Sequence, residues 1–188
     1  MSTFKVHDAD TAPADSKPLL ENSVKSFGSI PNLHGVLATS PQALEAYQMT
    51  HKLFMETSFN QEELTVVWQT INVANECHYC VPAHTAIGHM MKIDNNLLEA
   101  LRNNEPLPNA KLQALKDMTL TIRDNRGVVS DDQMQAFKDA GYGEQQVLEI
   151  ILGLAQKTIS NYTNHFAKTP VDEAFQKFAW EPQGHATV

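Results

Sequence analysis

The sequence predicts an all-α protein built from about eight helices. Apolar residues recur at helical spacing along most of the chain, and several segments open with a capping residue, as at Ser40 and Asn60. No stretch has the alternating apolar pattern between turn residues that is typical of a β-strand. The chain has 188 residues, 42% of them hydrophobic, which is enough for one domain with a sizeable core.

The first part of the chain differs from the rest. Residues 1–17 are polar and contain Pro and several Asp, so we expect a flexible N-terminal tail there and a single helical domain over residues 18–188. The tail has no apolar core segment of the kind that a secretory signal needs. No apolar run approaches the ~20 residues of a membrane span. We therefore expect a cytoplasmic protein with no membrane partner.

Caps and turn residues divide the domain into elements. We expect a turn at residues 28–33, a loop at 103–108 and a turn at 141–143. The expected helices cover, in chain order, residues 18–27, 41–56, 61–74, 80–91, 97–101, 109–126, 131–140, 143–166 and 170–178.

Pro82 sets the start of the fourth of these helices. Proline lacks an N–H, so it fits without cost only in the first turn of a helix. The helix is therefore expected to begin near Tyr79 or Cys80, which leaves Cys77 at its mouth. A continuous helix with a kink at Pro82 is the alternative that the sequence leaves open.

The chain contains only two cysteines, Cys77 and Cys80, and His84 follows the second by four residues. Helix positions i, i+3 and i+4 share a face, so two thiols and a base are expected on one stripe. Neighbouring thiols on one turn can reach disulfide range, roughly 4.4–6.8 Å between Cα atoms. Two other interpretations stay open: the cysteines pack as small apolar residues, or they bind zinc with His78 as a further ligand.

A cysteine pair at a helix N-terminus suits thiol chemistry. The reactive species is the thiolate, and the unpaired N–H groups and helix dipole lower the thiol pKa from its usual value near 8.5. One thiolate can attack a peroxide oxygen and become a sulfenic acid, with which the second thiol condenses to a disulfide. An outside reductant then restores the pair. His84, with an ordinary pKa near 6.5, is suited to accept and donate protons near neutral pH.

The residues around the cysteine pair resemble a known family. Because of the run Asn75-Glu76-Cys77-His78-Tyr79-Cys80 followed by His84-Thr85, the chain resembles the AhpD-like branch of the carboxymuconolactone decarboxylase superfamily. Residues 160–165 and 169–172 resemble the ending of peroxidase-related members. The resemblance covers roughly residues 40–178 and implies an all-α AhpD-like domain, homo-oligomers and thiol-dependent peroxidase activity. The decarboxylase branch proper lacks the cysteine pair, so lactone decarboxylation is disfavoured.

The resemblance also implies roles for individual residues. It makes Cys80 the attacking cysteine, Cys77 the resolving cysteine and His84 the histidine of a proton relay. The catalytic expectation therefore rests on these three residues.

The family's relay also uses a glutamate twelve residues before the first cysteine, and in this chain Thr65 stands at that position. We expect a neighbouring carboxylate to take its place, Glu63 before Glu76. Glu62 and Glu63 also fit a capping box and a favourable helix dipole, which is a structural role that needs no relay.

Several further side chains are candidates for the substrate site. We expect Tyr79, between the cysteines, and His165, in a polar run of the last long helix, to contact substrate. His78 also lies between the cysteines, where it either tunes their potential or is exposed. The remaining histidines of the helical domain are expected to be packing or surface residues: His34, His51 and His89.

Composition limits the partners. The net charge of −8 and the absence of a basic stripe argue against nucleic acid. No glycine-rich phosphate loop occurs, so we expect neither a nucleotide nor a flavin, nor a metal. The expected partners are a hydroperoxide substrate, a dithiol or protein thiol as reductant, and further copies of the chain. Alternatives from other classes are a redox-sensing or interaction protein with a switching disulfide, and a metal-binding module.

Overall fold

The computed structural model describes residues 4–182, and this part of the chain contains helices but no strand. Nine α-helices lie there, eight of them with eight residues or more, so the predicted all-α architecture is confirmed. The elements are η1 Ala14–Ser16, α1 Lys17–Phe27, α2 Asn32–Leu37, α3 Pro41–Met55, α4 Gln61–Ala74, α5 Cys80–Met90, α6 Asn95–Arg102, α7 Ala110–Asp124, α8 Asp131–Asp139, α9 Glu144–Ala167 and η2 Glu173–Phe178, where η marks a 3₁₀ helix. Within these residues no helix is both long enough and apolar enough to cross a membrane.

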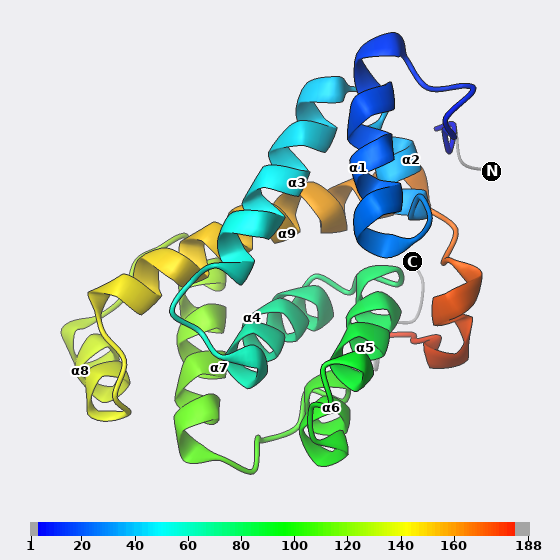
Figure 1. Ribbon diagram of the computed structural model, residues 1–188. Helices are drawn as coiled ribbons and strands as arrows, with labels where there is room; N and C mark the ends of the chain where they lie inside the picture. Colours follow the sequence, from blue (N-terminus) through cyan, green and yellow to red (C-terminus); the bar gives the residue numbers. More distant parts are fainter. Residues whose placement is uncertain (1–3, 183–188) are drawn as a thin grey trace.

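The longest helix, α9, joins two groups of helices (Figure 1). One group consists of α1, α2 and α3, and the other of α4, α5, α6 and α7, with α8 at one end. α9 packs against α2 and α3 of the first group and against α4, α5 and α7 of the second. The larger apolar cluster lies mainly among α4, α6 and α7, whereas the smaller one, among α1, α2 and α3, includes Cys77 and Cys80. The cysteine pair therefore lies where the two groups meet.

Most helices begin where capping residues predict. Asn60 and Glu63 form the capping box of α4, in which each side chain accepts the other residue's N–H at 3.0 Å. Asn109 caps α7, and its Oδ1 accepts from Lys111 at 2.8 Å. α5 begins at Cys80 with Pro82 in its first turn, so the prediction of a helix start here is confirmed over a kinked, continuous helix.

α2 corrects one expectation, because it begins inside the segment predicted to be only a turn. Six residues are too few for apolar periodicity to stand out in the sequence, and nearly all of α2 is buried. Gly35 is needed in this helix because the N-terminal segment crosses it closely. A Cβ at Gly35 would lie 2.6 Å from the carbonyl oxygen of His7, well inside van der Waals contact.

Residues 4–16, part of the predicted flexible tail, lie against the domain. The His7 N–H donates to the Gly35 carbonyl at 3.0 Å, and Ser16 Oγ donates to the Ala38 carbonyl at 2.7 Å. Flexibility of this segment in solution stays a prediction. Residues 1–3 of the predicted tail and 183–188 of the predicted domain lie outside the described residues.

The expected final short helix over residues 170–178 is present as a 3₁₀ helix that begins later, at Glu173. The chain between Thr169 and Asp172 is not helical, and a 3₁₀ helix, η2, follows it. The Asp172 side chain explains this path, because Oδ1 accepts the Asn32 N–H at 3.0 Å and Oδ2 accepts the Tyr79 hydroxyl. These two bonds tie the C-terminal segment to α2 and to the start of α5.

Candidate active site

The loop between α4 and α5 sets the positions of both cysteines. Glu76 takes a left-handed conformation, with φ of 53°, directly after α4. The Cys77 N–H then donates to the Asn72 carbonyl at 3.0 Å, and Asn72 Nδ2 donates to the Cys80 carbonyl at 3.4 Å. Cys80 is consequently the first residue of α5, where free N–H groups and the helix dipole favour an anion.

The two thiols are free and buried. The Cys80 N–H donates to Cys77 Sγ at 3.3 Å, so both cysteines occupy one turn, as their spacing predicts. Asn164 of α9 donates through Nδ2 to Cys80 Sγ at 3.2 Å and lies 3.9 Å from Cys77 Sγ. Hydrogen bonds donated to a sulfur favour its thiolate form.

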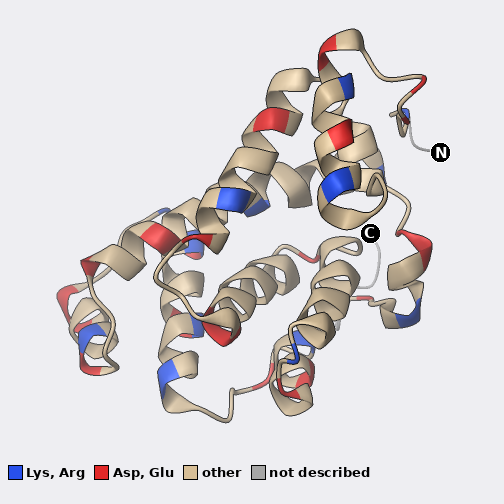
Figure 2. Cartoon of the chain, viewed as in Figure 1, with Lys and Arg blue, Asp and Glu red and all other residues tan. Residues whose placement is uncertain are grey.

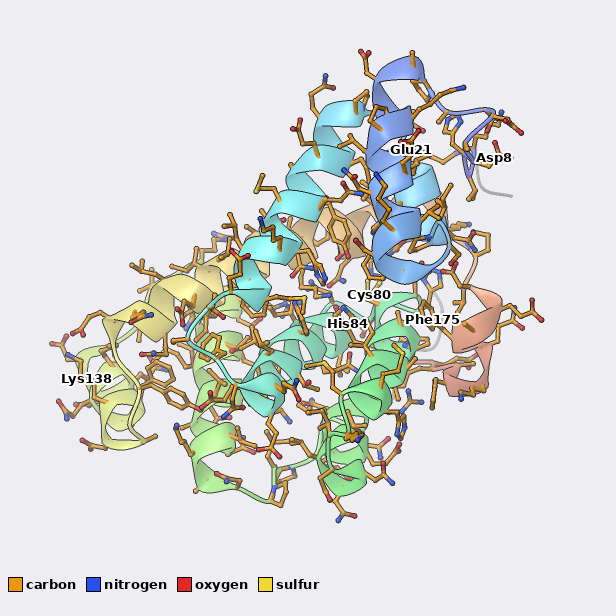
Figure 3. The ribbon with its side chains drawn as sticks, in the orientation of Figure 1. Asp8, Glu21, Cys80, His84, Lys138 and Phe175 are labelled. Carbon is orange, nitrogen blue, oxygen red and sulfur yellow. The ribbon has the colours of Figure 1, made fainter. Side chains whose placement is uncertain are left out.

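Cys80 lines a cavity of about 270 Å³, whereas Cys77 does not. The cavity lies between the two groups of helices and has a largely apolar and aromatic lining, which includes Phe27, Leu33, Tyr47, Tyr79, Ala83 and Phe175. Figure 3 shows Cys80 and His84 close together in the middle of the molecule, with Phe175 beside them. A small molecule in this cavity therefore reaches Cys80 before Cys77.

The positive charge of the site comes from α9. α5 itself has no Lys, Arg, Asp or Glu between Cys80 and Met90 (Figure 2). Lys157 of α9 is completely buried, and its Nζ contacts His84 Nε2. The same ammonium lies 5.6 Å from the ring centre of Trp68, within the range of a cation–π contact.

The two thiols differ in pKa. Burial alone raises the pKa of Cys80, but the hydrogen bond from Cys77, the charge of Lys157 and hydrogen bonds from Ser160 and Asn164 outweigh it and lower the pKa to about 6. The pKa of Cys77 is raised, because its thiol donates to the Cys80 sulfur and because it is buried beside that charge. The pair therefore holds one thiolate, on Cys80, and one thiol, on Cys77, near pH 7.

His84 is neutral in this site. Burial, followed by electrostatic interaction with Lys157 and then with His51, places the pKa of His84 well below its ordinary 6.5. Burial lowers the pKa of Lys157 to about 8, while electrostatic interaction with the cysteine pair, first with Cys80, acts in the opposite direction. The expectation that His84 titrates near neutral pH is therefore wrong, and the cation beside the thiolate is Lys157.

Neutral aromatic and amide groups surround the lysine. Gln156 Oε1 accepts the Trp68 indole N–H at 2.8 Å, and Gln156 Nε2 donates to His51 Nδ1 at 2.9 Å. His51 stacks on Trp68, with 5.6 Å between ring centres. Burial is the largest cause that lowers the pKa of His51 to about 4, so it accepts this hydrogen bond as a neutral ring.

Solved structures with the same arrangement of helices are known. The alkylhydroperoxidase AhpD core of an uncharacterized peroxidase-related protein from Ralstonia eutropha JMP134 superimposes with a TM-score of 0.81, at 21% identity over 93% of this chain and 94% of that chain. A peroxidase-related protein from Silicibacter sp. TM1040 gives 0.75, at 17% identity over 92% and 94%. The chain has the AhpD-like fold. The debrominase Bmp8, in a cysteine-to-alanine variant bound to 2,3,4-tribromopyrrole, gives 0.71 at 13% identity over 94% and 97%.

No protein-family model and no curated protein sequence matches this chain. At 13–21% identity, the structural similarity establishes the fold that the sequence resemblance implied.

The AhpD-like fold does not bring Glu63 to the cysteines. Glu63 lies nine residues before Asn72 on α4, about 13 Å along the helix axis. Its carboxylate accepts from Tyr142 at 3.0 Å and pairs with Lys111 at 3.1 Å, besides its role in the capping box. Thr65, at the position of the family glutamate, donates back to the Gln61 carbonyl at 2.8 Å and supplies no carboxylate.

Glu76 and Tyr79 lie on different sides of the cysteine loop. Glu76 lines a separate cavity with Arg102 and Trp180, whereas Tyr79 lines the cavity of Cys80. The Tyr79 hydroxyl donates to Asp172 and accepts the Leu33 N–H at 3.3 Å. Of the two, only Tyr79 is placed to contact a molecule bound at Cys80.

His165 and His78 lie outside the cavity lining. His165 is exposed, and its Nε2 bonds to the Asn75 carbonyl at 2.6 Å. His78 Nε2 bonds to the Thr169 carbonyl at 3.0 Å. Among residues 4–182, no three His, Cys, Asp or Glu side chains are grouped so that they could hold a metal ion.

The residues that sequence reasoning missed come from the buried face of α9. Polar side chains recur at helical spacing on this face: Gln156, Lys157, Ser160, Asn161 and Asn164. All five are buried. A lysine on the apolar face of a long helix is the signal that could have found them, since buried lysines are rare unless they are paired.

Proposed function

We propose that this protein is a thiol-dependent hydroperoxidase with an antioxidant role, in which Cys80 attacks the peroxide and Cys77 resolves the sulfenic acid. The observation that carries the proposal is a thiolate-stabilising environment at Cys80, next to Lys157, on the wall of a largely apolar cavity. The AhpD-like fold of structures named as alkylhydroperoxidase or peroxidase-related proteins supports it.

The proposed cycle begins at Cys80. Its thiolate attacks the terminal oxygen of a hydroperoxide, the O–O bond breaks, and an alcohol leaves. Cys77 then attacks the sulfenic sulfur, water leaves, and a disulfide forms. A dithiol or protein thiol reduces this disulfide by exchange, which fits the reducing cytosol expected from the sequence.

Substrate contacts follow from the cavity walls. Apolar and aromatic groups such as Phe27 and Phe175 favour the organic part of a hydroperoxide, with its peroxide end at Cys80. Tyr79, fixed by Asp172, forms part of the same wall and is proposed to contact the substrate. No metal, flavin or nucleotide takes part in this cycle.

A stopped-flow assay with tert-butyl hydroperoxide and a dithiol donor tests the proposal. Steady consumption of peroxide by the wild type, and its loss in Cys80→Ser, are the expected results. Without the dithiol donor, Cys77→Ser should reduce one equivalent of peroxide and then stop at the sulfenic acid. If the wild-type protein forms its disulfide but does not turn over peroxide, it is a redox switch rather than a peroxidase.

A further inference from the structure

Lys157 is a buried cation, and the groups that stabilise its charge are the two cysteines of the site. Its relative exposure is 0%, and a buried ammonium is costly unless an opposite charge lies near it. The groups that favour its charged form are Cys80 and then Cys77. The other groups that face it are neutral: His84 on α5, Trp68 on α4 and His51 on α3.

Oxidation of the pair removes the partner charge. In the disulfide neither sulfur is ionised, so the ammonium would stay buried without a counter-charge. The desolvation cost of such an isolated ion favours its neutral form. Lys157 is thus expected to be an ammonium beside the thiolate and an amine beside the disulfide.

We propose that Lys157 is the proton reservoir of the cysteine pair, giving its proton through His84 to the leaving alkoxide and regaining it when the disulfide is reduced. This inference rests on the proposed peroxidase cycle and adds the proton source to it. The Nζ contact to His84 Nε2 provides the first step of the path. With Nε2 as acceptor, the neutral ring carries its hydrogen on Nδ1, so His84 can accept the proton of Lys157 at Nε2 and give its own from Nδ1.

With this proton from Lys157, every step of the cycle balances. The thiolate, the ammonium and ROOH give Cys80 sulfenic acid, the neutral amine and ROH, with the S–O bond formed and the O–O bond broken. The Cys77 thiol and the sulfenic acid then give the disulfide and water. A dithiol donor returns two electrons and two protons, which become the Cys77 thiol and the Lys157 ammonium, with Cys80 again a thiolate.

Proton counting in a single turnover tests this directly. Reduced, lightly buffered protein at pH 7 is mixed with one equivalent of tert-butyl hydroperoxide in the presence of a pH indicator dye, and absorbance at 240 nm follows the thiolate. If Lys157 supplies the proton, loss of the thiolate is accompanied by no net proton uptake. If Lys157 stays charged, one proton per disulfide is taken from solution, and that result overturns the proposal.

Two variants separate charge from proton transfer. Lys157→Arg keeps a cation that does not deprotonate, so it should keep the 240 nm signal but take up one proton per disulfide. Lys157→Met should lose the thiolate signal at pH 7. The number of protons that the wild-type protein takes up per disulfide decides the test by itself. A variant that fails to fold therefore does not affect it. A wild type without a thiolate signal at pH 7 also contradicts the proposal.

A second oxidant separates this inference from the proposed function. Diamide accepts two electrons and two protons from a thiol pair, so the proton count is the same as with peroxide. If the protein fails to reduce peroxide yet takes up no proton with diamide, the peroxidase proposal fails and the reservoir stands. If the protein reduces peroxide but takes up one proton per disulfide with both oxidants, the reservoir proposal fails and the peroxidase proposal stands.

Discussion

At the scale of residues, one helical turn gives two chemically similar side chains different properties. Cys80 is the first residue of α5, accepts an amide hydrogen bond and lines the cavity, whereas Cys77 precedes the helix and lies behind it. Burial is outweighed by the hydrogen bond from Cys77 and the charge of Lys157, which lower the pKa of Cys80 to about 6, whereas the hydrogen bond to Cys80 and burial raise that of Cys77. The assignment of attacking and resolving cysteines remains a proposal, and this asymmetry supports it.

His84→Ala is predicted to slow peroxide turnover by about 10²–10⁴-fold, because positioned proton-transfer groups contribute on that order. Steady-state rates over a range of pH check this. Since His84 is neutral, its removal should leave the thiolate absorbance at pH 7 in place, unlike Lys157→Met. Full activity with an unchanged pH profile in His84→Ala would mean that the proton reaches the substrate by another path.

At the scale of elements, local sequence predicted what local interactions determine. Caps and Pro82 located most helix starts, including that of α5, and the Cys-x-x-Cys spacing located the thiols. Lys157 could not be placed in this way, because it lies 73 residues from His84 in the sequence and meets it only through the packing of α9 on α5. α2 was missed because six buried residues carry too little periodicity.

Glu63 is predicted to act as a cap and not as a relay group. Asn60→Ala should lower the free energy of unfolding by about 1 kcal/mol, since it removes part of the capping box. Glu63→Ala should lower it further, because it also removes the pair with Lys111 and the acceptor of the Tyr142 hydroxyl. Urea unfolding measures that loss. Both variants should keep peroxide turnover within about twofold of wild type. A large loss of turnover in Glu63→Ala alone would restore the glutamate to the relay.

Two histidines, His34, which is buried on α2, and His51, which is partly buried on α3, predict acid sensitivity of this group of helices. Burial is the largest cause that lowers the pKa of each to about 4. Between pH 6.5 and 4 the unfolded chain binds protons that the folded chain does not, so stability is fully present above about pH 6.5 and falls as pH decreases. The loss at pH 5 should be on the order of 1–2 kcal/mol per histidine.

Urea unfolding at pH 7 and pH 5 checks this prediction. His34→Gln, which keeps a polar group near Ser23, should be less stable at pH 7 but lose less stability between the two pH values. Equal pH dependence in the variant and the wild type would exclude His34 as a source of the effect.

At the scale of the whole molecule, the outer face of α9 is exposed and uncharged. Between Leu148 and Phe166 its exposed residues include no Asp, Glu, Lys or Arg, although the chain carries a net charge of −8. Four large side chains there are strongly exposed: Leu148, Ile151, Tyr162 and Phe166. An uncharged helix face can meet a second copy of itself across a two-fold axis without like-charge repulsion, so we propose it as the homo-oligomer interface.

Light scattering at micromolar concentration should give a mass that is a multiple of the single chain. The double variant Ile151→Glu and Tyr162→Glu should shift the mass to the monomer, because it places like charges opposite each other. Val128→Glu, at an exposed apolar residue in a loop outside this face, is the control and should keep the wild-type mass. A monomeric wild type would contradict the proposed assembly.

The central claim is that Cys80 and Cys77 form one reversible redox unit that reduces a hydroperoxide. Its most direct measurement is thiol counting on the reduced protein after one equivalent of tert-butyl hydroperoxide, combined with a non-reducing gel. Free thiols should fall from two to zero per chain, no cross-linked dimer should appear, and a dithiol should restore both thiols. Thiols that persist after the peroxide is added, or links that form only between chains, would contradict it.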